Sequence, residues 1–226
     1  MSAVELQIDP KWCDRVRGLP FLYPCAGNDT ASAIEAFCGI CEPILFVDKA
    51  TVREPRIPEG FLVERVPPQN HSARPVSVDP RQHQRHREWH ATAPDGRFGL
   101  VAYTTADAEE YLRNMPPRSI GVFMHVGDNP PGEGGSGMHF LSSTVGPRGG
   151  IPLLDVLLEK LADQALVISD GSNSDLSMRG EDKRYFSAVS SIGRAGFIFA
   201  SVGKLSGRRV MADIYGFERV VQVARE

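Results

Sequence analysis

The fold is decided by residues 19–48, LPFLYPCAGNDTASAIEAFCGICEPILFVD, near the start of the chain. Residues 19–25 form a short apolar and aromatic run, which predicts a buried strand. Residues 30–38 place apolar side chains at helical spacing, and residues 44–47 form a second apolar run. A strand, a short loop, a helix and a strand in this order predict a βαβ unit, whose right-handed crossover makes the two strands parallel neighbours.

Further along the chain, helices and strands continue to alternate. Residues 106–115 and 152–164 carry apolar stripes at helical spacing, so each stretch predicts a helix. Residues 119–126 and 165–169 are apolar runs that predict buried strands after these helices. Each glycine-rich or acidic loop follows a predicted strand, and this is where ligands of open α/β sheets bind.

Two antiparallel pairs are also expected. Residues 88–93 and 98–104 predict a hairpin that turns at an Asp-Gly pair. Near the end of the chain, residues 195–202 and 208–215 alternate between apolar and polar side chains, which is typical of half-buried strands. We expect these two strands to form a terminal hairpin joined by residues 203–207.

Parallel βα units first and an antiparallel pair last predict an α/β protein. We expect a Rossmann-like three-layer sandwich, with a mostly parallel sheet and a C-terminal antiparallel hairpin. Residues 51–80 carry many prolines and little periodicity, which predicts an irregular insertion. The 226 residues are thus expected to form one domain, residues 1–226, with a proline-rich insertion at about 51–80.

The composition is that of an ordinary globular protein, since 42% hydrophobic and 23% charged residues argue against a disordered or fibrous chain. The net charge of -3 provides no general attraction for nucleic acid or anionic membranes. Nucleic acid stays a possible partner only through local basic segments, residues 81–90 and 204–209. No apolar stretch has the length of a membrane span, and the first residues lack the pattern of a signal peptide. We therefore expect a cytoplasmic protein without a membrane partner.

The four cysteines, Cys13, Cys25, Cys38 and Cys41, all lie in the first fifth of the chain. A disulfide framework would be spread over the whole domain, so we expect reduced thiols. Cys38 and Cys41 have the spacing of a redox pair, but they follow a predicted helix, whose C-terminal dipole disfavours thiolates. A zinc site with four thiolates is possible by number, whereas packing in the core explains the same residues without a metal. We predict no metal site.

Three histidines, His83, His86 and His90, follow one another at the i, i+3, i+7 spacing of a helix face. Such a face can direct three imidazoles to one metal ion. These histidines alternate with arginines, and no acidic or cysteine ligand accompanies them. A solvent-exposed basic face is therefore the preferred interpretation.

The loop after the first apolar run has the features of a ligand site. Ala26 and Gly27 are small enough for a ligand to approach the backbone, and the helix that begins near Thr30 offers unpaired N–H groups. Asp48 stands at the end of the next strand, where an acidic residue holds a ribose diol in many such folds. A tight turn with a capping carboxylate would explain the same residues without a ligand. The predicted cofactor-binding residues are Tyr23, Pro24, Cys25, Ala26, Gly27, Asn28, Asp29 and Asp48.

These residues also carry a resemblance to a known family. The loop PCAGNDT, residues 24–30, resembles the P-F-A-G-S-G-T loop of amino-group methyltransferases in the class I S-adenosylmethionine-dependent family. Asp48 falls where that family has its ribose-binding acid, and the order of the later elements is similar. The resemblance implies S-adenosylmethionine as a small-molecule cofactor. Asn28 and Asp29 depart from the family's small residue and glycine.

A second loop, residues 127–137, is rich in glycine and follows the strand predicted at 119–126. Asn129 stands where the same methyltransferases carry a D/N-P-P motif, whose first side chain and a proline carbonyl bind the target amine. Gly132 replaces the aromatic residue that stacks on a base there, which argues against methylation of a nucleobase. Asp128 and Glu133 are the carboxylates of this loop, and Glu133 can act as a base.

Asp170 ends the strand predicted at 165–169, so we expect its carboxylate to face the same crevice, although an Asx turn explains it without a ligand. The second loop and the ISDGSN segment at 168–173 also resemble parts of an uncharacterised bacterial family with Y-P-x-x-G-x-D and GEGGSG motifs. That resemblance implies no activity. The predicted catalytic residues are Asp128, Asn129, Glu133 and Asp170.

These observations predict an S-adenosylmethionine-binding, methyltransferase-like protein whose substrate the sequence leaves open. The first alternative is a binding or assembly protein that keeps the fold without the chemistry. The second is a nucleotide-dependent transferase with a divalent cation on Asp128 and Asp170.

Overall fold

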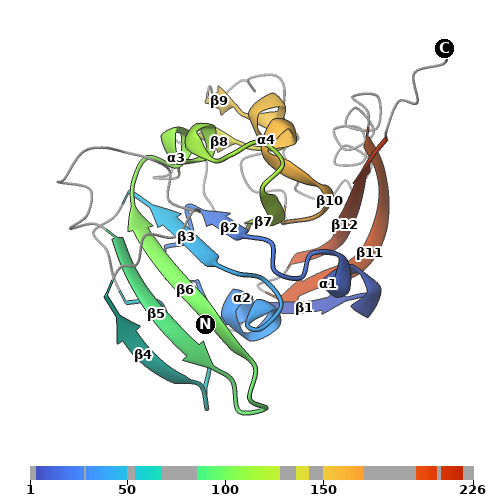
Figure 1. The fold of residues 1–226 in the computed structure, drawn as a ribbon. Coiled ribbons are helices and arrows are strands. Elements are labelled where there is room, and N and C mark those ends of the chain that lie inside the picture. The colour runs from blue at the N-terminus through green and yellow to red at the C-terminus, as the bar shows by residue number, and fades with distance from the viewer. Residues whose placement is uncertain are drawn as a thin grey trace.

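A computed structural model describes residues 4–27, 29–49, 54–67, 86–127, 136–142, 150–170, 197–207 and 210–220 (Figure 1). Strands dominate this part of the chain, and the helices within it have only six or seven residues each. The helices are α1 (Pro10–Arg15), α2 (Ala31–Phe37), α3 (Ala108–Asn114) and α4 (Leu154–Lys160). The strands are β1 (Glu5–Ile8), β2 (Phe21–Pro24), β3 (Ile44–Asp48), β4 (Leu62–Val66), β5 (His86–Thr92), β6 (Phe98–Thr105), β7 (Ile120–His125), β8 (Met138–His139), β9 (Ile151–Pro152), β10 (Leu161–Ser169), β11 (Phe197–Gly207) and β12 (Val210–Arg219). None of the described helices has the length and apolarity that crossing a lipid bilayer requires.

Ten strands form one mixed sheet in the order β1-β11-β12-β10-β7-β2-β3-β6-β5-β4. The central strands β10, β7, β2, β3 and β6 run parallel to one another. On one side β12, β11 and β1 extend this centre by antiparallel pairing, and on the other side β5 and β4 do the same. Figure 1 shows these antiparallel strands as the two flanks of the sheet, while β8 and β9 form a separate parallel pair.

The prediction of an α/β, Rossmann-like three-layer sandwich with a mostly parallel sheet is wrong. The described part of the chain is mostly β, and its large sheet is mixed rather than mostly parallel, because the flanking strands add five antiparallel strand pairs to the four parallel ones. The physical reason is that segments expected to be irregular or helical pair with strands instead. Within the predicted insertion, β4 pairs with β5, and Leu161, expected inside a helix, pairs with Ile120 of β7.

The βαβ unit at residues 19–48 is confirmed. β2 and β3 pair in parallel from Phe21–Ile44 to Pro24–Val47, with α2 between them in the chain. Thr30 is the N-cap residue of α2, but its side chain makes no capping hydrogen bond. Its hydroxyl donates to the carbonyl oxygen of Arg56 at 2.9 Å. The apolar runs therefore become adjacent strands, as their pattern predicts.

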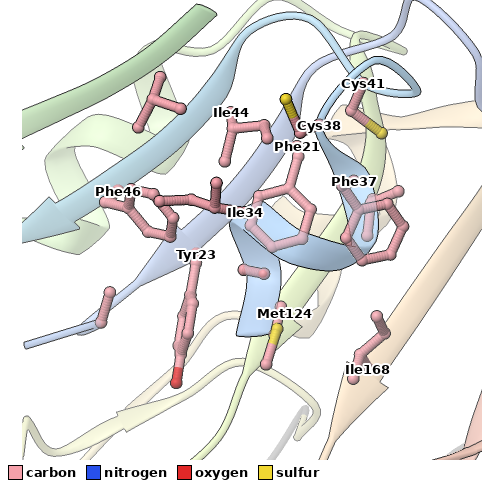
Figure 2. Packing of buried hydrophobic residues seen from close by; sticks show 14 of the residues in the cluster. Phe21, Tyr23, Ile34, Phe37, Cys38, Cys41, Ile44, Phe46, Met124 and Ile168 are labelled. Carbon is pink, nitrogen blue, oxygen red and sulfur yellow. The ribbon is translucent and has the colours of Figure 1, made fainter. Parts of the chain in front are cut away.

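Buried side chains cover both faces of the sheet. On one face, α1 and α2 pack on a cluster rich in aromatic rings, in which the centroids of Phe21 and Phe37 lie 5.0 Å apart. Figure 2 shows Ile34 of α2 among these rings, beside Phe46 of β3. On the other face, α3 and α4 contribute leucines and Tyr111 to a second cluster. Helices of six or seven residues are therefore enough to cover the centre of the sheet.

The helix predicted at 152–164 is shorter than its apolar stripe. α4 ends at Lys160 because the next residues enter β10. The carbonyl oxygens of Glu159 and Lys160 accept the N–H groups of Arg118 and Ser119, just before β7, at 3.0 and 2.9 Å. Tertiary pairing thus ends a helix that the local pattern would continue.

The terminal antiparallel hairpin is confirmed, but its expected turn is misplaced. Residues 203–207 belong to β11, where they pair with β12 from Gly203–Ile214 to Gly207–Val210. Their glycines indicated a turn, yet Gly203 lies close against a neighbouring strand. A Cβ there would lie 2.2 Å from the carbonyl oxygen of Gln7 in β1, so the close approach of β1 requires a residue without one.

Candidate functional site

The parallel strands end at one edge of the sheet, where their carboxyl ends meet. From β2 the chain proceeds to β3 and β6 on one side, and it then returns to β7 and β10 on the other side of β2. Ligands of open parallel sheets bind where the strand order reverses in this way. The ends of β2 and β7, with the turn residues Gly27 and Gly127, therefore flank the candidate site.

β2 and β7 do not pair along their full length. Their registered pairs are Phe21–Val122 and Leu22–Phe123, although β2 runs on to Pro24 and β7 to His125. β2 and β3, in contrast, pair along the whole of β2. The ladder between β2 and β7 therefore stops before the strands do, at the edge from which the two loops leave.

The first turn follows β2 and is held by two side chains from neighbouring strands. Asp48 Oδ2, at the end of β3, accepts the N–H of Gly27 at 2.9 Å. The hydroxyl of Tyr103 on β6 donates to the carbonyl oxygen of Gly27 at 2.9 Å. Cys25 and Gly27 adopt φ values of 57° and 54°, in the left-handed region that a chain leaving the strand at a sharp angle requires. Both peptide groups of Gly27 are thus fixed by the sheet.

The space above Gly27 is free of the protein's own described atoms. A Cβ built on this glycine meets no heavy atom within 4 Å. A ligand can therefore approach the backbone here, which is the arrangement expected when small residues face a nucleotide-sized guest. Ala26, in contrast, is buried in the aromatic cluster, so it is a packing residue of the turn.

The second turn follows β7 and uses the same types of contact. Asp170 Oδ2, just after β10, accepts the N–H of Gly127 at 2.8 Å. The hydroxyl of Tyr23 donates to the carbonyl oxygen of Val126 at 2.8 Å. Tyr23, predicted to bind a cofactor, is therefore a buried residue that connects β2 to the end of β7.

An ion pair between Lys49 and Asp107 lies next to Asp48 in the chain, just after the end of β3. Lys49 Nζ lies 2.7 Å from Asp107 Oδ2, and this bond raises the pKa of Lys49. Burial opposes ionisation of Asp107, but the ammonium group and the N–H groups of Glu109 and Glu110 outweigh it and lower the pKa of Asp107. Asp107 is also the N-cap residue of α3. The residue after Asp48 is thus ion-paired to the start of this helix.

The structure brings some of the predicted site residues together, and others lie outside the described residues. The structure brings Asp48 together with the turn at Gly27, and Asp170 with the turn at Gly127. Asp29 follows the first turn, where its N–H donates to the carbonyl oxygen of Ala26 at 3.0 Å. Pro24 is the last residue of β2. Four other predicted residues, Asn28, Asp128, Asn129 and Glu133, lie outside the described residues.

Sequence analysis missed a polar cluster on β5 and β6. His86 Nδ1 lies 2.7 Å from Thr104 Oγ1, and His86 Nε2 lies 2.8 Å from Glu88 Oε1. The helical spacing assigned to the histidines is wrong for His86 and His90, which lie on strand β5, and His83 is outside the described residues. Only the register between β5 and β6 brings these groups together, so no sequence motif indicates the cluster.

The cysteines are free thiols, as expected. Burial raises the pKa of Cys38 and Cys41, with the larger effect at Cys41. Cys38 caps the C-terminal end of α2, as the sequence indicated. Within the described ranges, no three His, Cys, Asp or Glu side chains lie close enough together to hold a metal ion.

No protein-family model, curated protein or solved structure matches the chain. Function is therefore argued from the strand edge itself. The edge combines a strand-end carboxylate, Asp48, with a glycine turn that has open space above it. A carboxylate accepts hydrogen bonds from hydroxyl groups, and a bare turn permits close contact with a flat or ribose-containing molecule.

Proposed function

We propose that the chain binds S-adenosylmethionine at the carboxyl edge of β2 and β3 and transfers its methyl group to a small acceptor. The observation that carries this proposal is the position of Asp48. Its carboxylate ends β3, faces the turn after β2, and lies one strand away from the point between β2 and β7 where the strand order reverses. A carboxylate in this position can accept hydrogen bonds from the two hydroxyl groups of a ribose.

The turn supports the same proposal. Tyr103 and Asp48 fix both peptide groups of Gly27, so the turn does not have to be ordered when a ligand arrives. Preorganisation of this kind reduces the entropic cost of binding. The open position at the Cβ site of Gly27 allows a ligand to contact the backbone.

S-adenosylmethionine supplies an electrophilic methyl group when bound. The protein then has to hold the acceptor in line with that group, and positioning alone accounts for a large part of such catalysis. Asp170 fixes the turn on the β7 side of the strand reversal, and in this proposal it orients the acceptor. Glu133 would act as a base where the acceptor has to lose a proton.

Calorimetric titration with S-adenosylhomocysteine and S-adenosylmethionine tests the proposal. We expect wild-type protein to bind both, and Asp48→Asn to weaken binding by about tenfold or more, since a hydrogen bond to a charged group contributes about 1.5–3 kcal/mol. Asp48→Asn keeps an oxygen that can accept the Gly27 N–H, so the turn is retained. Asp95→Asn, an exposed carboxylate in the turn between β5 and β6, is the matched control and is expected to bind as wild type.

Two results would contradict the proposal. One is absence of binding by folded wild-type protein, and the other is equal affinity of wild type and Asp48→Asn. Thermal unfolding of each variant confirms that a loss of affinity is not a loss of folded protein.

A further inference from the structure

Glu88, His86 and Thr104 form a continuous hydrogen-bonded chain on β5 and β6, next to the end of β3. The strand register explains how they meet. His86 stands directly opposite Thr104 in the antiparallel pair, and Glu88 lies two residues further along on the same face of β5. The residue opposite Glu88 is Ala102, whose small side chain leaves space for the carboxylate to reach back to His86.

The contacts of His86 are compatible with the tautomer that a general base needs. An ionised carboxylate only accepts hydrogen bonds, so the Nε2 atom that contacts Glu88 carries the proton. In a neutral imidazole Nδ1 is then unprotonated, and it accepts the hydroxyl proton of Thr104 at 2.7 Å. This is the state in which a histidine can take a proton from a hydroxyl group.

Burial decreases along the chain from the carboxylate to the hydroxyl. The side chain of Glu88 is 2% exposed and that of His86 is 13% exposed, while Thr104 is partly exposed near the end of β6. A shielded carboxylate, a nearly buried base and a hydroxyl on a partly exposed residue form the order that nucleophilic catalysis by an alcohol needs. All three lie on paired strands, which hold side chains more rigidly than loops.

We propose that Thr104 is a nucleophile for acyl transfer, with His86 as its general base and Glu88 as the residue that positions and stabilises the imidazolium. Thr104 Oγ1 attacks the carbonyl carbon of an ester, and its proton moves to His86 Nδ1. The proton then passes to the departing alkoxide as the ester C–O bond breaks, which leaves an acyl group on Thr104. Water attacks this acyl ester through the same base, releases the carboxylic acid and restores the hydroxyl.

The charge of the cluster selects the class of substrate. Glu88 places a negative charge behind His86, so anionic donors such as phosphate esters are disfavoured. An uncharged carboxylic ester avoids this repulsion. Thr104 is registered with Val47 of β3, one position before Asp48, and its side chain lies on the opposite face of the sheet from that of Asp48, which is registered with Thr105. The proposed reaction uses no residue of the cofactor site, so it stands or falls independently of S-adenosylmethionine binding.

The test is incubation of the full chain with p-nitrophenyl acetate, followed by peptide mass spectrometry. We expect acetylation at Thr104 and release of p-nitrophenolate. Thr104→Val is expected to abolish acetylation at this position, and Thr104→Ser to restore it at the introduced serine. Thr92→Val, on the same face of β5, is the matched control and is expected to react as wild type.

Two variants test the hydrogen-bonded chain that runs from Glu88 through His86 to Thr104. His86→Asn is expected to lower the rate of acetylation by about a hundredfold, since general base catalysis contributes roughly 10²–10⁴-fold. Glu88→Gln keeps a hydrogen-bond partner for Nε2 without the charge, and it is expected to lower the rate by a smaller factor. Circular dichroism melting shows whether each variant is folded. The proposal would be overturned if folded wild-type protein showed neither acetyl-Thr104 nor a release of p-nitrophenolate that Thr104→Val abolishes. An unchanged rate in folded His86→Asn or Glu88→Gln would also overturn it.

Discussion

The turns after β2 and β7 are built from the same parts. In each, a strand-end carboxylate accepts a glycine N–H, Asp48 with Gly27 at 2.9 Å and Asp170 with Gly127 at 2.8 Å. In each, a tyrosine hydroxyl donates to a carbonyl oxygen of the turn. Both glycines have positive φ, 54° and 77°. The strand reversal is therefore flanked by two similar turns.

The two turns differ in which peptide groups are held. Tyr103 and Asp48 bind the carbonyl and the N–H of Gly27 itself, which belong to two successive peptide groups. In the second turn, the carbonyl of Val126 and the N–H of Gly127 belong to a single peptide group. The first pair of contacts thus fixes the backbone conformation of Gly27, whereas the second pair orients only one peptide plane.

The two turns also differ in how deeply their hydrogen bonds are buried. Both contacts of the first turn are partly buried, but in the second turn the tyrosine contact is buried and the carboxylate contact is exposed. An unsatisfied buried polar group costs more free energy than an exposed one, which water can satisfy. Stabilisation is therefore shared between two side chains in the first turn and concentrated on Tyr23 in the second.

The largest effect is expected from Tyr23→Phe. This change removes the donor to a buried carbonyl oxygen and should lower the free energy of unfolding by about 1–3 kcal/mol. Tyr103→Phe removes a donor to a partly buried carbonyl and should cost about 1 kcal/mol. Urea denaturation of both variants provides the comparison, with equal m-values as the control for a common unfolded state. A larger loss in Tyr103→Phe would contradict the assignment of burial to the two contacts.

An intermediate effect is expected from Gly27→Ala. No atom obstructs the added methyl group, so the cost is conformational, about 1–2 kcal/mol for a left-handed alanine. Gly18→Ala is the matched control, because Gly18 has φ 74° and also has no atom within 4 Å of a Cβ. We expect similar losses of stability in both, measured by urea denaturation, and a loss of S-adenosylhomocysteine affinity in Gly27→Ala alone. Equal affinities in the two variants would show that no ligand approaches Gly27.

Only some of these contacts could be predicted from the sequence. The pairing of Asp48 with the Gly27 turn could be predicted, because a βαβ unit brings the end of one strand beside the start of the next loop. The tyrosines could not be predicted as turn-holding residues. Tyr23 and Tyr103 lie within apolar runs, where the pattern indicates burial but does not indicate where a hydroxyl group points.

Local sequence patterns predicted the central strands of the sheet, but they did not predict the position of β1 or the end of α4. β1 pairs with β11, from Glu5–Ser206 to Ile8–Gly203, so its place depends on residues at the far end of the chain. The end of α4 depends on the pairing of Leu161 with Ile120. Long-range pairing of this kind leaves no mark in a short sequence window, and it is why an α/β sandwich with a mostly parallel sheet was expected where a mixed sheet forms.

The smallest effect is expected from Asp170→Ala. The contact of Asp170 with Gly127 is exposed, so water can replace the carboxylate and the free energy of unfolding should fall by less than about 0.5 kcal/mol. Asp48→Ala, at the equivalent position of the first turn, should cost about 1 kcal/mol or more because its contact is partly buried. Urea denaturation of the two variants measures the difference. Equal losses would mean that the second turn is as shielded from water as the first, and the asymmetry between the turns would then have to lie in their peptide geometry alone.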